Sequence, residues 1–366
     1  MLLKMETNIR TEKKIENNQE SSPLLLRRRT NLKVSKNVPN SLHGEQVAAG
    51  WPIWLVSVAS EAIYVWTPRA AHTFEMLHQI SRGARSTEYK AKDTLTSKMV
   101  ALKKVRIDRS DSVSLRSMAR QLIIMRRLDN HPNVIKLEGL VVSSKNKKYY
   151  ELHLVFEHTE HDLSELAISG GTKLTETQVK PYMLQLLSGL EHCHSLGVLH
   201  RNLNGSNLLF DDKGILKISG FGSASFFDPN NKKPKSNRVA NLWYRAPELI
   251  LGATDYGVGI DLWSAGCILG ELLTGEPIMA GRTQADQLHQ IFKLCGSPSE
   301  TYWRTSNLLY KSLFMPQCPY KRCIVRGRTF QTCSLASLQL IHLSVTPLLL
   351  YCGFFTVKPS LKHSEA

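Results

Sequence analysis

The strongest constraint on the fold is a change in sequence pattern along the chain. Residues 74–154 consist of short stretches typical of strands, and we predict extended segments at 99–103 and 149–156. Between these two segments, residues 114–128 have the pattern of a helix, which ends before His131-Pro132-Asn133. This part of the chain therefore predicts a small β-rich body that carries one helix.

From residue 175 onward, helical patterns dominate. Residues 179–196 are strongly amphipathic, whereas residues 259–273 are mostly apolar, which indicates a buried helix. A small β-rich part followed by a larger helical part is typical of an α+β protein with two lobes and a cleft between them. The length of 366 residues is sufficient for one large domain of this kind.

The N-terminal stretch differs from this body. Residues 1–48 are polar, charged and aperiodic, and they include the basic run Arg27-Arg28-Arg29, so we predict a disordered basic extension. Residues 49–73 contain apolar positions such as Trp51 and Trp54 at roughly helical spacing. We predict a short helical segment that packs against the folded body, with a lipid-facing helix as the alternative.

The composition changes again near the C-terminus. Residues 329–357 contain no Asp, Glu, Lys or Arg, and this length is sufficient to cross a bilayer. Pro347, His342 and many Ser, Thr and Gln residues argue against a membrane anchor. We therefore predict that residues 324–366 form a hydrophobic tail that packs on protein or stays disordered.

The formal net charge of +16 suits acidic partners such as nucleic acid, anionic membranes or phosphorylated peptides. Much of it comes from the ends: residues 1–40 carry nine Lys/Arg against four Glu, and residues 321–366 carry six against one. No zinc, homeodomain or RNA-binding pattern is present, so we predict no specific nucleic-acid binding. The seven cysteines include no C-x-x-C pair, and Met1-Leu2-Leu3-Lys4 begins no secretory signal, which indicates free thiols in a reducing compartment.

Several motifs, in the right order and at the right spacing, resemble those of eukaryotic protein kinases. They are Val100-Ala101-Leu102-Lys103-Lys104, His200-Arg201-Asn202-Leu203-Asn204-Gly205-Ser206-Asn207, Ile218-Ser219-Gly220-Phe221-Gly222, Trp243-Tyr244-Arg245-Ala246-Pro247-Glu248 and Asp261-Leu262-Trp263-Ser264-Ala265-Gly266-Cys267. The runs Leu249-Ile250-Leu251-Gly252, Gly281-Arg282-Thr283 and 288–298 are similar to cyclin-dependent kinases, in particular to the plant, transcription-linked type.

The resemblance covers about residues 50–323 and implies a protein-kinase-like two-lobed fold. A small β-rich N-lobe is expected over 74–158, and a larger helical C-lobe over 159–323. The family continues with further helices where this chain departs from it, so we expect an incomplete C-lobe followed by a non-family tail over 324–366.

By this resemblance, ATP would lie under a G-x-G-x-x-G loop, where missing side chains let backbone N–H groups approach phosphate. In the matching stretch 81–86, Gly83 alone survives. Lys103 occupies the position that contacts the α- and β-phosphates, but Gln121 replaces the glutamate that would hold it by an ion pair. The positions that would contact adenine are Phe156, Glu157 and Thr159. We expect ATP binding that is weak and independent of metal.

The resemblance also implies that the reactive positions have been replaced. Asn202 stands where an aspartate would accept the proton of the substrate hydroxyl, a role typically worth about 10²–10⁴-fold in rate. Asn204 replaces the lysine that stabilises the transferred phosphoryl group, and Gly220 replaces a magnesium-binding aspartate. Asn207 matches the second metal ligand, and no acidic residue nearby in the sequence substitutes for the lost carboxylates. We therefore predict impaired catalysis and no magnesium site.

Ser236 matches the position at which these kinases are phosphorylated, and Arg120 and Arg201 match two arginines that receive that phosphate. The alternative is an exposed loop serine. Three further positions match structural residues of the family: Arg245, Glu248 and Asp261. The arginine that pairs with Glu248 in the family comes from a region where this chain departs from it, and a buried unpaired carboxylate costs about 3–5 kcal/mol.

The helix over 114–128 is where cyclin-type partners dock in the family, and Ser114, Arg116 and Met118 keep its register. The leading hypothesis is a catalytically impaired cyclin-dependent-kinase-like module that binds cyclin-like partners or protein substrates in the nucleus or cytoplasm. One alternative is an active ATP-dependent serine/threonine kinase that phosphorylates proteins such as the C-terminal domain of RNA polymerase II. The others are a poorly folded truncated product and a form tethered to membranes by its tail.

Overall fold

The structure is a computed structural model that describes residues 40–83, 86–143, 149–168, 174–211, 213–230 and 234–295. The tail predicted over 324–366, the last part of the predicted C-lobe and most of the predicted basic extension lie outside these residues. Within the described ranges, no helix combines the length and the apolar character needed to cross a membrane.

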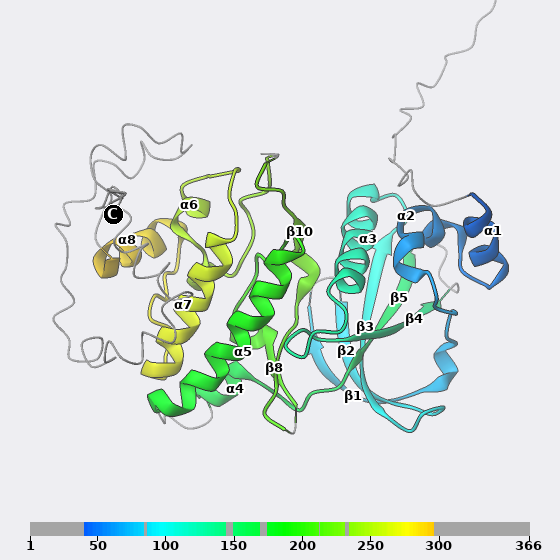
Figure 1. Cartoon of the computed structure of the whole chain (residues 1–366), viewed down its shortest axis with the longest axis horizontal. Coiled ribbons are helices and arrows are strands. Elements are labelled where there is room, and N and C mark those ends of the chain that lie inside the picture. The colour runs from blue at the N-terminus through cyan, green and yellow to red at the C-terminus, as the bar shows by residue number, and fades with distance from the viewer. Residues whose placement is uncertain are drawn as a thin grey trace, which may run out of the picture. The chain divides into compact units, whose positions relative to one another are not determined.

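The first part of the described chain is an antiparallel sheet with the strand order β1-β2-β3-β5-β4 (Figure 1). Its strands are β1 (Phe74–Arg82), β2 (Ser86–Asp93), β3 (Met99–Asp108), β4 (Leu137–Ser143) and β5 (Tyr149–Glu157). The strands predicted at 99–103 and 149–156 are confirmed as β3 and β5, which lie side by side in this sheet.

The predicted helix over 114–128 is confirmed as α3 (Ser112–Arg127). Asp111 caps its first turn, because its carboxylate accepts hydrogen bonds from the backbone N–H groups of Val113 and Ser114, both at 3.0 Å. The buried face of α3 consists of Met118, Ala119, Leu122, Ile124 and Met125.

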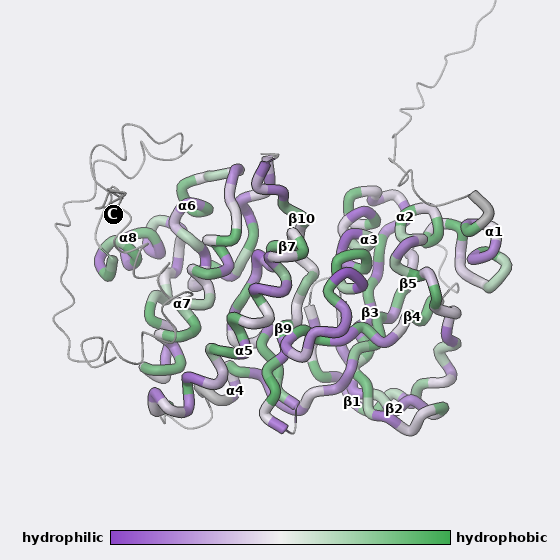
Figure 2. Tube along the Cα trace, in the orientation of Figure 1, coloured by the Kyte–Doolittle hydropathy of each residue, from purple (hydrophilic) through white to green (hydrophobic). Residues whose placement is uncertain are grey.

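The second part of the described chain is mainly helical, as the sequence predicts. Its helices are α4 (Leu163–Ile168), α5 (Glu176–Ser195), α6 (Pro247–Ile250), α7 (Gly259–Thr274) and α8 (Gln284–Cys295). Hydrophobic residues follow much of α7, and most of this helix is buried (Figure 2). Gly275 ends it in the left-handed conformation, with φ of +81°, which glycine adopts without steric cost.

Short strands position the loops between these helices. They are β6 (His161–Asp162), β7 (Val198–Leu199), β8 (Leu208–Phe210), β9 (Leu216–Ile218) and β10 (Ser225–Phe226). The pairing of β7 with β10 and of β8 with β9 brings residues 200–207 close to residues 219–224. Two separate predicted motifs therefore share one site.

Two helices precede the sheet: α1 (Asn40–Ala48) and α2 (Ile53–Ile63). The prediction that the disordered extension reaches residue 48 is wrong, because α1 covers its last nine residues. The physical reason is a tertiary contact: the buried Gln46 side chain donates to the carbonyl of Ser60 at 2.9 Å. The helix α2 lies in the segment predicted to be helical and packs against α3.

Aromatic side chains fasten the α2 segment to the body. The indole N–H of the buried Trp51 donates to the carbonyl of Trp66 at 3.0 Å. Trp54 stacks on Tyr150 at the start of β5, with ring centroids 4.2 Å apart. The apolar side chains of α2 therefore pack on protein, which argues against the lipid-facing alternative.

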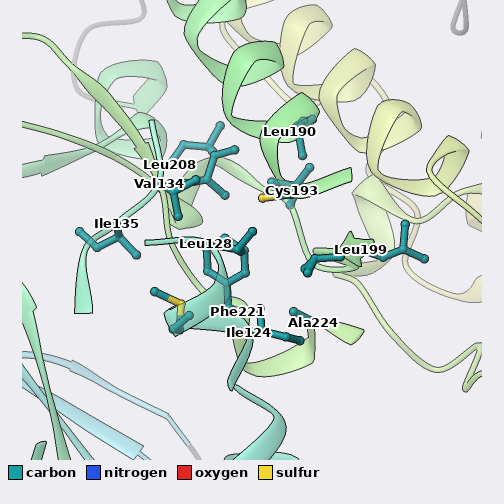
Figure 3. Packing of buried hydrophobic residues seen from close by; sticks show 14 of the residues in the cluster. Ile124, Leu128, Val134, Ile135, Leu190, Cys193, Leu199, Leu208, Phe221 and Ala224 are labelled. Atoms are coloured by element: carbon teal, nitrogen blue, oxygen red, sulfur yellow. The ribbon is translucent and has the colours of Figure 1, made fainter. Parts of the chain in front are cut away.

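One hydrophobic core runs through both parts of the described chain. Ile124 and Leu128 of the α3 region lie close to Phe221 and Ala224, and Cys193 of α5 belongs to the same core (Figure 3). This packing joins α3 to the segment that begins at Gly220, so the sheet, α3 and the loop motifs are held together by side-chain burial.

Leu55 and Ile53 both lie on α2, one buried and one exposed, so substituting each of them tests whether α2 packs on the body. Leu55→Ala should lower the free energy of unfolding by about 2–5 kcal/mol, because Leu55 is fully buried. Ile53→Ala should change it by less than about 0.5 kcal/mol, because Ile53 is 71% exposed. Urea unfolding of the full chain measures both values, and equal effects would mean that α2 does not pack on the body.

Candidate active site

A small cavity lies between the sheet and the helical part. Its described lining is Glu88, Ala101, Lys103, Gln121, Met125, Ile135, Phe156, Glu157, Thr159, Ser206, Asn207, Leu209, Ser219, Gly220 and Phe221. Five residues predicted for nucleotide or metal binding are therefore brought together: Lys103, Phe156, Glu157, Thr159 and Asn207. Gln121 and Gly220, predicted to replace an ion-pair glutamate and a metal ligand, line the same cavity. Gly83 lines a different depression, with Lys104 and Arg106. Asn202 and Asn204 are not among the residues that line either one.

Lys103 is engaged by a residue that the sequence analysis missed. Its Nζ lies 2.5 Å from Oε1 of Glu88, and both side chains are partly buried. Glu88 on β2 stands directly opposite Lys103 on β3 in the antiparallel register, so both side chains point to the same face. A signal was present in the sequence, since Glu88 takes the valine position of the G-x-G-x-x-G-x-V pattern.

Part of the cavity lining is apolar. Ala101, Ile135, Phe156 and Leu209 contribute aliphatic and aromatic side chains to it. The carboxylate of Glu157 has two partners within the protein: it accepts from the backbone N–H of Lys136 at 2.8 Å, and Lys217 Nζ lies 3.1 Å from it. These residues fit a planar heteroaromatic ring, whose faces need apolar contact.

The predicted catalytic loop is a closed set of amide hydrogen bonds. Asn202 Oδ1 accepts from the backbone N–H of Asn241 at 3.1 Å. The carbonyl oxygen of Asn202 accepts from the side-chain amides of Asn204, at 3.1 Å, and of Asn207, at 2.8 Å. Asn204 Oδ1 in turn accepts from the backbone and the hydroxyl of Ser206. The side-chain amides of Asn202, Asn204 and Asn207 thus each make at least one hydrogen bond within the protein, and an amide cannot act as a general base.

Gly220 and Asn207 occupy one small space. Gly220 has φ of +80°, and a Cβ added there would collide with the side-chain amide of Asn207. The backbone carbonyl of Asn207 accepts from Ser219 N at 2.8 Å, which holds the two segments together. The side chain of Asn207 therefore fills the room that an aspartate at position 220 would need.

The donor set does not fit magnesium. The ion requires oxygen ligands in octahedral geometry, usually including carboxylates. Among the residues that the structure describes, no group of three or more His, Cys, Asp or Glu side chains could hold a metal ion. The two carboxylates that line the cavity, Glu88 and Glu157, are each paired with a lysine.

Asp261 on α7 anchors the loop that carries these asparagines. Its carboxylate accepts from the backbone N–H groups of His200, at 2.9 Å, and Arg201, at 2.7 Å, and from Nε2 of His194 at 3.0 Å. Burial alone would raise the pKa of Asp261, but the hydrogen bond and charge of His194 lead the interactions that outweigh it, so its pKa is lowered. The aspartate is therefore a buried anion with three donors.

The buried imidazole of His200 helps to join the two loop motifs. Burial lowers the pKa of His200, which favours the neutral ring. Its Nδ1 accepts from the backbone of Asn202 at 3.3 Å, so Nε2 carries the proton and donates to the carbonyl of Ser219 at 2.6 Å.

Two of the predicted regulatory residues, Arg201 and Ser236, are joined by a tyrosine that the sequence analysis did not single out. The hydroxyl of Tyr256 accepts from Arg201 Nη1 at 3.0 Å and donates to the carbonyl of Ser236. Ser236 is exposed, and its hydroxyl accepts from Arg238 N at 3.3 Å. Burial, followed by repulsion from Arg201, lowers the pKa of Arg120, so the two predicted phosphate-binding arginines are electrostatic neighbours.

The other predicted structural residues lie in the segment before α7. Arg245 donates to the carbonyls of Val239, at 2.9 Å, and Ala240, at 2.8 Å, which ties the segment to itself. Glu248 lies in the first turn of α6, and its backbone carbonyl accepts from Ala253 N at 2.8 Å.

Asp261→Asn should lower the free energy of unfolding by about 1–3 kcal/mol at pH 7, because one carboxylate oxygen becomes an amide group that faces buried N–H donors. Because the pKa of Asp261 is lowered in the folded state, the ionised carboxylate contributes fully to the free energy of unfolding above its unfolded-state pKa, about 3.9. This contribution is lost as the pH falls through the folded-state pKa. The difference in free energy of unfolding between wild type and Asp261→Asn, measured with denaturant, should therefore be smaller at a pH well below about 3.9 than at pH 7. Asp286, which is only partly buried and accepts from Arg282 N at 2.8 Å, is the control: Asp286→Asn should have a smaller effect at both pH values.

Gly220→Asp should not restore magnesium binding, because the new side chain must displace Asn207. We expect a loss of stability of about 1–3 kcal/mol, in the range of overpacked sites. Gly214→Asp is the matched control, since Gly214 has a similar φ of +75° but open space at its Cβ position. Thermal melts with and without magnesium and ATP measure both effects, and a magnesium-dependent rise in Tm for Gly220→Asp would contradict the geometry.

The comparisons with known proteins agree with this arrangement. The family model described as the protein kinase domain matches residues 74–329, more than half of the chain. A serine/threonine-protein kinase of Arabidopsis thaliana is 58% identical over 306 residues, which cover 83% of this chain and 52% of that protein. Cyclin-dependent kinase C-2 C of Arabidopsis thaliana is 49% identical over 281 residues, covering 77% of this chain and 43% of that protein. The chain thus spans about half the length of the curated relatives it matches.

A chain from the crystal structure of the yeast RNA Pol II CTD kinase CTDK-1 complex superposes with a TM-score of 0.60 and 34% identity. The match covers 69% of this chain and 79% of that one. The chain described here therefore belongs to the protein kinase family, and its sequence is similar to plant serine/threonine and cyclin-dependent kinases.

Proposed function

We propose that this chain is a cyclin-dependent-kinase-like module that binds a cyclin-like partner or protein substrates without transferring phosphate to them. The observation that supports the proposal is the identity of the residues at the reactive positions. Asn202 and Gly220 stand at the positions of the base and of the metal ligand, and the surrounding amides hydrogen-bond one another. Loss of the metal alone removes several kcal/mol of transition-state stabilisation, and the losses do not add simply.

Nucleotide binding on this proposal is weak and independent of metal. The family implies an ATP site, and the apolar residues that line the cavity suit adenine. Lys103 is paired with Glu88, so its ammonium group offers a phosphate only the N–H donors that this carboxylate leaves. Gly220 supplies no carboxylate that could hold magnesium beside that phosphate.

The relatives support a cyclin-like partner. One curated relative is named a cyclin-dependent kinase, and the structural relative was solved as a kinase complex. The helix α3 is the docking helix that the resemblance implies, and Val113 in its first turn is 68% exposed. An exposed apolar residue on a capped, well-packed helix can be buried by a partner without ordering the helix first.

Binding of the full chain to a panel of recombinant plant cyclins, measured by calorimetry, tests the partner. Val113→Arg should weaken the complex at least about tenfold, the loss expected for a central contact residue. Leu95→Arg is the control, since Leu95 is 71% exposed on the turn between β2 and β3, away from α3. Absence of binding to any cyclin would contradict the partner proposal.

The proposed lack of phosphate transfer is tested by following labelled phosphate from ATP, with magnesium and the bound cyclin present. We expect no transfer to a peptide repeat of the RNA polymerase II C-terminal domain or to a generic substrate. Transfer that disappears in Lys103→Met would establish the alternative, an active kinase.

A further inference from the structure

The helix α3 is buried on two sides, and only one of them faces the cavity. Gln121 and Met125 line the cavity. Ala119 is two residues away from Gln121 in the sequence, which places the two side chains on nearly opposite sides of an α-helix. Ala119 is nevertheless only 4% exposed. The side of α3 that points away from the cavity is therefore covered by another part of the chain.

The cover is residues 51–66, which comprise α2 and its flanking residues and are called the α2 segment here. The helix α2 packs against α3, and Figure 1 shows the two helices side by side. Ala119, Leu122 and Arg126 recur at helical spacing, so they form one stripe along α3. The guanidinium group of Arg126 lies 4.4 Å from the centroid of the Trp66 ring, which places the α2 segment on this stripe. Leu122, in the middle of the stripe, is fully buried.

The α2 segment is attached through the core of the protein. Leu55, Ala59 and Ile63 of α2 are almost fully buried and belong to the hydrophobic core that runs through the described chain. Just after the segment, the guanidinium group of Arg69 donates to both carboxylate oxygens of Asp93 on β2, at 2.7 and 2.8 Å. Detaching the segment would return its apolar side chains to water, which is strongly unfavourable.

A protein that docks on α3 must therefore use what the α2 segment leaves free. The exposed residues of α3 are Val113 and Arg116 near its start and Arg127 at its end. Arg127 already lies over the ring of Phe226, 4.6 Å from its centroid. The start of α3 is thus the part of this helix that is open to an outside partner, whereas the stripe around Leu122 is closed.

We propose that the α2 segment is a built-in partner of α3. It holds the helix in place in the free chain, and it restricts a cyclin-like protein to the start of α3, which carries Val113 and Arg116. The second half rests on the proposed function, which supplies the identity of the outside partner. The first half does not depend on that partner, because it concerns the chain alone.

Amide hydrogen exchange of the full chain without any partner tests whether the α2 segment holds α3. In wild type, the amides of residues 118–126 should exchange within about tenfold of the rate of the buried α7 amides. Leu55→Ala should accelerate exchange in α3 at least about tenfold more than in α7, because it loosens the cover of α3 first. Trp54→Ala removes the ring that stacks on Tyr150 and should act in the same direction, which keeps the test valid if Leu55→Ala does not fold.

Leu186→Ala is the matched control. Leu186 is 1% exposed in the same core, but it lies on α5, which packs on α7. This variant removes the same apolar group and should accelerate exchange in α7 at least as much as in α3. Equal acceleration of α3 and α7 in Leu55→Ala would overturn the inference, and so would rapid exchange of α3 in wild type.

Calorimetry with a cyclin that binds the wild-type chain tests the restriction. Leu55→Ala should leave the Kd of this complex unchanged or raise it, because a loosened α3 has to be ordered on binding. A complex that becomes more than about twofold tighter would overturn the restriction, since α2 and the cyclin would then compete for one face of α3. Absence of binding to any cyclin would contradict the proposed function and the restriction together, whereas the exchange result would still decide whether the α2 segment holds α3.

Discussion

The carboxylate of Asp261 holds the loop on which the rest of the candidate site depends. A buried charge is costly unless it is well hydrogen-bonded, and Asp261 receives bonds from the backbone of His200 and Arg201 and from His194. These bonds hold Arg201 at φ of +67°, a conformation that non-glycine residues rarely adopt. From there, the Arg201 side chain reaches the carbonyl of Ser223 and the hydroxyl of Tyr256, so one carboxylate links α7, the loop and the segment that carries Ser236.

The hydrogen bonds around Asp261 do not require the groups that perform phosphate transfer in the family. Asparagine has nearly the shape of aspartate, and its amide both donates and accepts, so Asn202 remains a hydrogen-bonded member of the loop. Gly220 leaves room that the Asn207 side chain occupies. The side-chain amides of Asn204 and Asn207 donate to the carbonyl of Asn202, so the asparagines themselves hold the form of the loop. The pairing of Glu88 with Lys103 follows the same rule, because polar groups that would serve a ligand are satisfied by the protein itself.

The shared hydrophobic core fixes the relative positions of the segments that these hydrogen bonds join. Phe221 follows Gly220 directly and is buried in the same core as α3 and α5 (Figure 3). The α2 helix packs on the other side of this assembly, where Trp54 stacks on Tyr150 and Arg126 of α3 lies over the ring of Trp66. The position of α3 is therefore determined from both sides by packing within the chain, whereas Val113 in its first turn is exposed.

The sequence by itself determined the strands β3 and β5, the helices α3, α5 and α7, and the chemical identity of the residues at the base and metal positions. These depend on local periodicity and motif spacing, which are properties of neighbouring residues. Only the tertiary structure decided three other features: the helical state of residues 40–48, the bridging role of Tyr256, and the ion pair between Glu88 and Lys103. Gln46 and Ser60, Arg201 and Tyr256, and Glu88 and Lys103 are each well separated along the chain. Packing, loop placement and strand register bring them together, and no local pattern encodes which distant partner a polar side chain will meet.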